Sequence, residues 1–303
     1  MIAKWMMFAI CTLFLSQGQA EASLGPVSIT MSVSDKQTVP RSSEQQGSVP
    51  KVPAHLFMPP NPTPPGSAKA ESLHLKYLLA QRTTNYYHAS PTQAKNIQLV
   101  ADRINGTVVQ PGQVFSYNKI GGPYNEHNGY GWGRAFSGDR IIPSLGGGVC
   151  QGASTLYSAL LRTGLQIVER HQHGLTVPYL PAGEDATVSY TSNLDFKFRN
   201  NQSTPVLISA KGYPEQRILT IAIWGAKPGP KIKVCHKVLA VYPYKTIVRP
   251  YKSNTSKGER VLSPGQAGAR VQNWLEIKTP NGTVRKDLGM DTYRASPRIV
   301  EKY

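Results

Sequence analysis

Eight prolines fall between residues 40 and 66, and they include the pairs Pro59-Pro60 and Pro64-Pro65. Proline lacks a backbone N–H and fixes its own φ, so this stretch cannot hold a regular helix or a sheet ladder. The longer segment 21–70 is rich in Ser, Gln and Pro and poor in apolar clusters. We therefore predict an extended linker over residues 21–70, with ordered structure beginning near Glu71.

An export signal is predicted before the linker, over residues 1–20. Lys4 supplies a positive charge, an uncharged apolar run of 11 residues extends from Trp5 to Leu15, and the segment ends in the small residue Ala20. This order is typical of a secretory signal peptide. A membrane-spanning helix needs roughly 20 apolar residues, so the run is short for a span, and the protein contacts a membrane only if the signal stays uncleaved. We expect a secreted, extracytoplasmic protein.

The chain is strongly basic. Its 34 Lys and Arg against 17 Asp and Glu give a formal charge of +17, and residues 231–303 contribute +10 through 15 basic and 5 acidic residues. Nucleic acid is the usual partner of such a protein, but an exported protein meets cell-wall polymers and lipid head groups instead. We expect peptidoglycan or anionic wall polymers as partners and no nucleic acid. The alternative is that the charge only maintains solubility.

The pattern of residues 71–228 predicts an α+β domain. Ser90 is a good N-cap and is followed by proline at the first helical position, which predicts a helix ending near Asn105. A second helix is predicted from about Cys150 to just before Gly164. Extended, apolar segments predict strands that form an antiparallel sheet, the last two as a hairpin. These strands are Gln166–Glu169, Thr187–Tyr190, Phe196–Phe198, Val206–Ala210 and Leu219–Trp224.

Residues 231–303 predict a small, basic, all-β domain. Asn281-Gly282 is a typical hairpin turn. Cys235 lies in this region, in a context unlike that of Cys150, so we predict two separate thiols rather than a disulfide. The predicted strands are Val238–Val241, Thr246–Pro250, Gly268–Ile277 and Val284–Lys286.

Cys150 follows three glycines at the predicted start of a helix. Free N–H groups and the positive end of the helix dipole favour a thiolate at such a position, and a glycine loop lets another chain approach closely. The neighbouring Gln151 could donate a side-chain N–H to a developing oxyanion. The alternative is that Cys150 is a small buried residue under a tight turn.

Histidines and carboxylates follow the cysteine in the order of a thiol-enzyme site. His171 and His173 come after the strand that follows the helix, and Asp185 and Asp195 come later. We predict Cys150 as nucleophile, His173 or His171 as general base, and Asp185 or Asp195 as the orienting carboxylate. One rival is a zinc ion held by Cys150, His171 and His173; another is a purely structural role for the histidines. The leading interpretation needs no cofactor. The predicted substrate-binding residues are Gly146, Gly147, Gly148, Tyr157 and Arg170.

Several motifs over about residues 80–210 resemble the VanW family, which is named for an accessory protein of vancomycin-resistance clusters. They are Arg103–Gly106, Pro111–Asn118, Gly129-Tyr130, Gly146–Gln151, Ser154–Tyr157, Glu169–His173, Pro181–Ala186 and Asp195–Asn200. Residues 231–303 more loosely resemble a glycine-marked β domain that is often attached to envelope proteins.

The resemblance implies a cell-envelope protein, linked to peptidoglycan and to glycopeptide resistance. The order of a helix with Cys, a strand with His and a strand with Asp is similar to that of transglutaminase-like and papain-like thiol enzymes. It implies amide hydrolysis or transfer, with a non-catalytic wall-binding module as the alternative. His173 is followed by Gly174-Leu175, which departs from the His-Ala-Trp run of transglutaminase-like domains.

Overall fold

The computed structural model describes residues 71–137, 140–250 and 258–302, which belong to one compact unit, Pro53–Tyr303. The predicted signal peptide at 1–20 and the predicted linker at 21–70 lie outside the described residues. Of the described chain, 48% is strand and 16% is helix, with three α-helices and several antiparallel sheets. The expected papain-like or transglutaminase-like α+β domain is therefore wrong, because strands that the sequence pattern did not reveal outnumber the helices.

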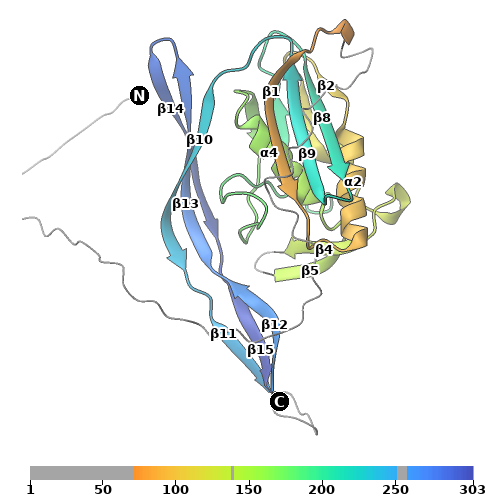
Figure 1. Ribbon diagram of the computed structural model, residues 1–303, viewed down its shortest axis with the longest axis vertical. Coiled ribbons are helices and arrows are strands. Elements are labelled where there is room, and N and C mark those ends of the chain that lie inside the picture. Colours follow the sequence, from red (N-terminus) through yellow and green to blue (C-terminus); the bar gives the residue numbers. More distant parts are fainter. Residues whose placement is uncertain (1–70, 138–139, 251–257, 303) are drawn as a thin grey trace, which may run out of the picture. The chain divides into compact units, whose positions relative to one another are not determined.

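A four-stranded antiparallel sheet forms the centre of the N-terminal part, with strand order β1-β9-β8-β2. Helices α2 and α4 pack against it: α4 contacts β1 and β9, and α2 contacts β8 (Figure 1). The central strand β9 is buried along its whole length and β8 along most of it. The bounds are β1 Tyr77–Asn85, α2 Pro91–Ile104, β2 Thr107–Val109, α4 Val149–Leu160, β8 Val206–Tyr213 and β9 Ile218–Gly225.

Helix α2 confirms the predicted first helix. The Ser90 side chain accepts a hydrogen bond from the backbone N–H of Gln93 at 3.2 Å. Ile97, Val100 and Ile104 are fully buried, so the predicted apolar face is the one that covers the sheet. The hairpin of β8 and β9 is also confirmed, although both strands are longer than predicted.

Helix α4 begins where the sequence predicts and is buried along almost its whole length. Gly148 caps its N-terminus with φ +107°, a conformation that favours glycine. Gly147 lies so close to Gly133 of the neighbouring hairpin that a Cβ there would be 2.3 Å from the Gly133 carbonyl carbon. The glycine run therefore allows its backbone to pack against the backbone of Gly133, next to the start of the helix that carries Cys150.

Smaller elements surround the helices. A three-stranded sheet has the order β3-β7-β6, and β4 pairs with β5 as a two-stranded hairpin. The predicted strand Thr187–Tyr190 is absent from the described sheets, which hold only isolated bridges there, His171 to Thr187 and Ser189 to Leu194. The reason is local: the Val188 backbone N–H and carbonyl contact the Cys150 sulfur of α4 and do not pair with a neighbouring described strand. The bounds are β3 Val114–Ser116, α3 Tyr117–Gly121, η1 Glu126–Asn128, β4 Trp132–Ser137, β5 Arg140–Leu145, β6 Gln166–Glu169 and β7 Lys197–Arg199.

The C-terminal part is built only of strands in its described residues. One sheet has the order β10-β13-β14, and the other has the order β11-β15-β12, in which β11 and β15 run parallel. The predicted hairpin at Asn281-Gly282 is confirmed, since Thr279 pairs with Gly282. The bounds are β10 Ile232–Tyr242, β11 Thr246–Pro250, β12 Glu259–Gln266, β13 Gly268–Thr279, β14 Gly282–Tyr293 and β15 Ser296–Lys302.

Among the described residues, no helix has the length and apolarity needed to cross a membrane.

Candidate functional site

Cys150 lies in the first turn of α4 and is half-buried at the wall of a cavity. Its Sγ is 3.5 Å from the Val188 backbone nitrogen, which donates to it, and 3.4 Å from the Val188 carbonyl oxygen. The Thr187 hydroxyl lies 3.7 Å from the same sulfur. The backbone N–H of Cys150 donates to no group in the described part of the chain, as is usual in the first turn of a helix. The sulfur of Cys150 is therefore fixed by contacts with Thr187 and Val188, and its backbone N–H is free to donate.

His173 and Asp185 form a buried pair beside the cysteine. The side chains are 2.7 Å apart between Nδ1 and Oδ2, and the same carboxylate oxygen accepts the His173 backbone N–H at 2.8 Å. His173 is 2% exposed and Asp185 is 0% exposed. The Phe136 ring packs edge-on against the imidazole, with 5.2 Å between centroids. These contacts fix the imidazole in one orientation, with Nδ1 committed to the carboxylate.

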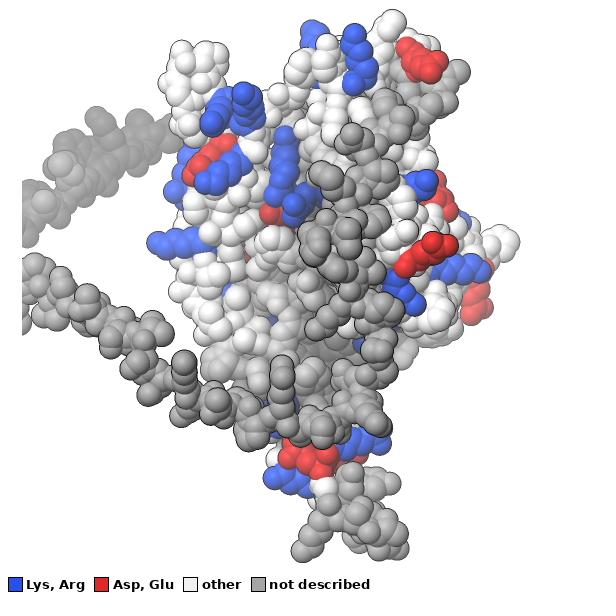
Figure 2. Space-filling model, in the orientation of Figure 1, with Lys and Arg blue, Asp and Glu red and all other residues white. Residues whose placement is uncertain are grey.

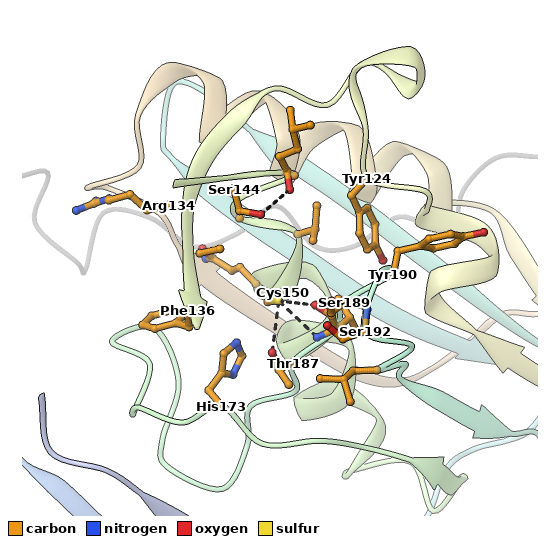
Figure 3. Close-up of a pocket in the computed structure, with 18 of the residues that line it drawn as sticks. Tyr124, Arg134, Phe136, Ser144, Cys150, His173, Thr187, Ser189, Tyr190 and Ser192 are labelled. Carbon is orange, nitrogen blue, oxygen red and sulfur yellow. Dashed lines mark hydrogen bonds between the residues drawn. The ribbon is translucent and has the colours of Figure 1, made fainter. Parts of the chain in front are cut away.

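The other ring nitrogen of His173 is directed toward the cysteine (Figure 3). This Nε2 is buried and has no hydrogen-bond partner among the described residues. Burial alone would lower the pKa of His173, but the Asp185 hydrogen bond and the nearby Cys150 raise it to about 9. Burial alone would raise the pKa of Cys150, but His173, the Val188 backbone and the Thr187 hydroxyl together lower it. The two shifts favour a thiolate–imidazolium pair near neutral pH.

Asp185 is the carboxylate that the fold brings to His173. Its pKa is lowered although burial opposes this, because His173, Arg170 and the Tyr293 hydroxyl stabilise the anion. The other candidate, Asp195, lies elsewhere and accepts hydrogen bonds from the Ser116 hydroxyl at 2.6 Å and from the backbone N–H of Asn118 at 2.9 Å. The structure thus separates two residues that the sequence alone leaves equivalent.

Two further sequence candidates have partners away from the sulfur. The Gln151 side-chain nitrogen donates to the Thr84 hydroxyl at 3.0 Å and to the Asn85 carbonyl at 2.8 Å, so both of its hydrogens are occupied. His171 lies on the surface side of the loop, with Nε2 3.0 Å from Glu169. The Cys150 backbone N–H, which has no acceptor among the described residues, is therefore a free donor beside the sulfur.

The zinc interpretation required Cys150, His171 and His173 to converge. The described residues contain no group of three or more His, Cys, Asp or Glu side chains arranged to hold a metal ion. His171 pairs with Glu169 instead, and the buried Nδ1 of His173 is taken by Asp185. The donor set of the described chain does not fit a zinc site.

The predicted substrate-binding residues divide into two groups. Gly146 and Gly148 line the cavity, whereas Gly147 is packed against Gly133. Tyr157 and Arg170 do not line it: they stack on each other, with the guanidinium 5.1 Å from the ring centroid. Arg170 also bonds Asp185, so it belongs to the support of the site.

The cavity has a volume of about 860 Å³. Figure 3 shows Tyr124 and Tyr190 on one side of Cys150 and Phe136 on the other. Arg134 is the only Lys or Arg, and there is no Asp or Glu, among the described residues that line it. Apart from His173, the remaining wall mixes apolar side chains such as Ile142, Leu145 and Leu194 with neutral polar ones. Its aliphatic hydroxyl and amide side chains are Gln93, Asn125, Ser144, Gln151, Gln172, Thr187, Ser189, Thr191 and Ser192.

Sequence reasoning missed three parts of the site. Phe136 lies on a short strand with no motif around it. Thr187 and Val188 contact the Cys150 sulfur, whereas the sequence pattern predicts a strand there. Tyr293 donates to Asp185 across 108 residues of sequence. No local pattern signals that last contact, because it depends on the packing of the C-terminal strands.

Residues 92–224 match the family model described as "VanW like protein". Among curated proteins, the chain is 39% identical over 143 residues to "Uncharacterized protein YoaR" of Bacillus subtilis, covering 47% of each protein. It is 30% identical over 113 residues to "Vancomycin B-type resistance protein VanW" of Enterococcus faecalis, covering 35% of this chain and 40% of that one. The matched region thus spans less than half of each of these two relatives.

Two solved structures match parts of the chain. "Crystal structure of HP0197-G5" is 17% identical and covers 24% of this chain and 99% of its own, with a TM-score of 0.15. "IgA1 Protease G5 domain structure" is 21% identical and covers 26% of this chain and 95% of its own, with a TM-score of 0.17.

Proposed function

We propose that this chain is an exported cell-envelope protein that cleaves or transfers peptide amides of peptidoglycan through Cys150. The match of residues 92–224 to the model of VanW-like proteins supports this proposal. One observation carries the proposal: a buried His173–Asp185 pair is directed at a thiol of lowered pKa in the wall of a cavity. Nucleophile, base and orienting carboxylate are the three roles that thiol acyl transfer requires.

The reaction follows from the protonation states. The Cys150 thiolate attacks the amide carbonyl carbon, and the carbonyl oxygen becomes an oxyanion that accepts the backbone N–H of Cys150. The His173 imidazolium then gives its Nε2 proton to the departing amine as the C–N bond breaks, which leaves a thioester. Water, or a second amine, attacks this thioester while His173 takes up a proton. Hydrolysis regenerates the thiol with a carboxylate product, and an amine acceptor gives transfer.

The cavity favours an uncharged or acidic peptide. Its described lining holds no acidic side chain, so a substrate that carries carboxylates meets no like charge there. Wall stem peptides are of this kind. The aromatic side chains of Tyr124, Tyr190 and Phe136 supply apolar surface beside the sulfur, and the neutral hydroxyl and amide groups can hydrogen-bond a peptide backbone.

Labelling of the two thiols tests the proposal. The thiolate is the form that reacts with iodoacetamide, so Cys150 should be alkylated below pH 7 in the folded protein. Cys235 is buried and its pKa is raised, so it serves as an internal control that reacts only at higher pH. Peptide mass spectrometry separates the two sites. In His173→Ala, the Cys150 profile should move to higher pH; equal, slow labelling of both thiols in the wild type would contradict the proposal.

Wall binding without turnover is the second candidate, and the charge of residues 231–303 favours it. These residues carry a net charge of +10, and ten of their Lys and Arg side chains lie on the described strands, where successive side chains alternate between the two faces and can point to solvent. Figure 2 shows basic side chains spread over the molecular face rather than gathered in one patch. Anionic wall polymers would be held by many weak contacts on such a surface. The name of one relative refers to vancomycin resistance, and a role in resistance for this chain is part of the proposal.

A further inference from the structure

Asp185 is held from two directions. His173 occupies one carboxylate oxygen, and the other oxygen accepts the Tyr293 hydroxyl at 2.5 Å and the Arg170 guanidinium at 3.2 Å. Tyr293 ends strand β14 and is fully buried. Its hydroxyl oxygen also accepts the backbone N–H of Gly183 at 2.7 Å. One tyrosine of the C-terminal strands therefore fixes both the carboxylate and the turn that carries it.

Further contacts attach the same loop to the same strands. The Arg170 guanidinium bridges Asp185 and Asp291, with Nη1 2.6 Å from the Asp291 carboxylate. Asn273 on β13 donates to the other Asp291 oxygen at 3.1 Å. The backbone also takes part, since the N–H of Arg294 donates to the Gly174 carbonyl at 2.7 Å. These polar contacts are largely buried, so they hold the loop and the C-terminal strands in one arrangement.

We infer that the C-terminal strands are part of the thiol site, and that Tyr293 is a positioning residue that holds Asp185, and through it His173, against Cys150. The inference rests on the proposed function. It assigns to strands β13 and β14 a role besides wall binding: the cysteine is competent only when these strands are docked on the loop that carries His173 and Asp185.

The Tyr293 hydroxyl stabilises the ionised form of Asp185. Asp185 is fully buried, and a buried carboxylate stays ionised only if donors compensate for the lost water. Without the Tyr293 hydroxyl, the pKa of Asp185 should rise, and a protonated Asp185 no longer supports the imidazolium that stabilises the thiolate. The other titratable and charged groups that face this pair are Arg170, Asp291 and Tyr157 around Asp185, and Tyr117, Tyr124 and Tyr179 around Cys150. Tyr293→Phe leaves all of them in place.

The test is the pH profile of Cys150 alkylation in Tyr293→Phe. The acid limb should move to higher pH by about one unit, so the alkylation rate at pH 6 should fall about tenfold. Tyr130→Phe is the matched control: Tyr130 is also buried and donates to the Gly121 carbonyl at 2.5 Å, but it does not line the cavity or contact Asp185. It should lose similar thermal stability and keep the wild-type profile.

A double-variant comparison separates positioning from general loosening. Asp185→Asn should shift the profile by more than Tyr293→Phe, and adding Tyr293→Phe to Asp185→Asn should shift it no further. An equal shift in both backgrounds would overturn the inference, as would a Tyr293→Phe profile identical to the wild type. The wild type gives a second measurement that needs no variant to fold: the Tyr293 hydroxyl proton should be a slowly exchanging NMR resonance, and rapid exchange would contradict the contact.

The proposed function and this inference fail in different ways. If Cys150 of the wild type is not alkylated below pH 7, the thiol site itself is wrong. If the wild type reacts and Tyr293→Phe reacts equally, the thiol site stands and only the role of the C-terminal strands is lost.

Discussion

Glu184 is buried next to Asp185 in sequence and serves a different purpose. Its carboxylate is bound by Arg162 at 2.8 and 3.0 Å, by His236 at 3.0 Å and by the Ser158 hydroxyl at 2.5 Å. Arg82 lies 3.6 Å away. The two adjacent acidic residues thus have different roles: Asp185 binds the imidazole of the site, and Glu184 connects α4 to strand β10.

The Glu184 cluster predicts how stability depends on pH. Burial raises the pKa of Glu184, but His236, Arg162 and Ser158 outweigh it and hold the pKa well below its usual range. The ionised carboxylate therefore stabilises the folded protein above about pH 4.5, and this stabilisation is lost as the pH falls below that value. The Glu184 hydrogen bond raises the pKa of His236, so that contribution is present below about 6.5 and lost as pH rises through the raised value. The melting temperature should be highest between about pH 5 and 6.5.

Removing the charge tests this assignment. Glu184→Gln should cost about 3 kcal/mol, the lower end for a broken buried ion pair, because the arginines are partly exposed. It should also flatten the pH dependence of the melting temperature. Glu276→Gln, at an exposed carboxylate, should leave the melting curve nearly unchanged. A Glu184→Gln protein with the wild-type pH dependence would show that other groups control it.

At the scale of elements, the glycine run sets where the cysteine lies. Gly147→Ala places a Cβ against the Gly133 backbone, where no flexible side chain can move aside. It should cost about 3 kcal/mol or more and reduce Cys150 alkylation at pH 6.5, because the start of α4 must shift. Gly106→Ala is the control: its φ is +74° but nothing lies within 4 Å, so it should cost about 1 to 2 kcal/mol and leave alkylation intact. Chemical denaturation and the labelling assay check both variants.

Local signals explain which elements were predictable. Helix α2 carries its own N-cap and apolar face, and the β8–β9 hairpin has two continuous apolar runs. Strand β1 gives no such signal, because its Arg82 and Thr84 side chains hydrogen-bond residues of α4 instead of alternating with apolar ones. The backbone at Thr187 and Val188 looks extended in sequence but serves the Cys150 sulfur.

At the scale of the whole molecule, the features that the sequence could not predict depend on contacts between residues far apart in the chain. The order of Cys150, His173 and Asp185 along the chain sufficed to nominate the site, since each has a distinctive neighbourhood. Choosing Asp185 over Asp195 required the fold, and so did Tyr293. The fold class was wrong for the same reason: strands such as β1, β2 and β3 pair with β9, β8 and β7, which lie far away in the sequence.

Retention on cell walls tests the charged surface of the intact protein. Four exposed lysines of the C-terminal part should be replaced by Gln together; none of them forms an ion pair with another described residue, and they are Lys237, Lys245, Lys278 and Lys286. The wild type should sediment with purified walls at 0.1 M salt and be released by about 0.5 M, because the Debye length falls from about 10 Å at 0.1 M to about 3 Å at 1 M. The fourfold variant should be released at lower salt while Cys150 is alkylated as before.

A matched variant with Lys95, Lys119, Lys211 and Lys227 replaced by Gln removes the same charge from the N-terminal part and should keep most of the retention. Equal loss in both variants would mean that total charge, rather than the C-terminal strands, holds the protein to the wall, and retention that ignores salt would point to the cavity instead.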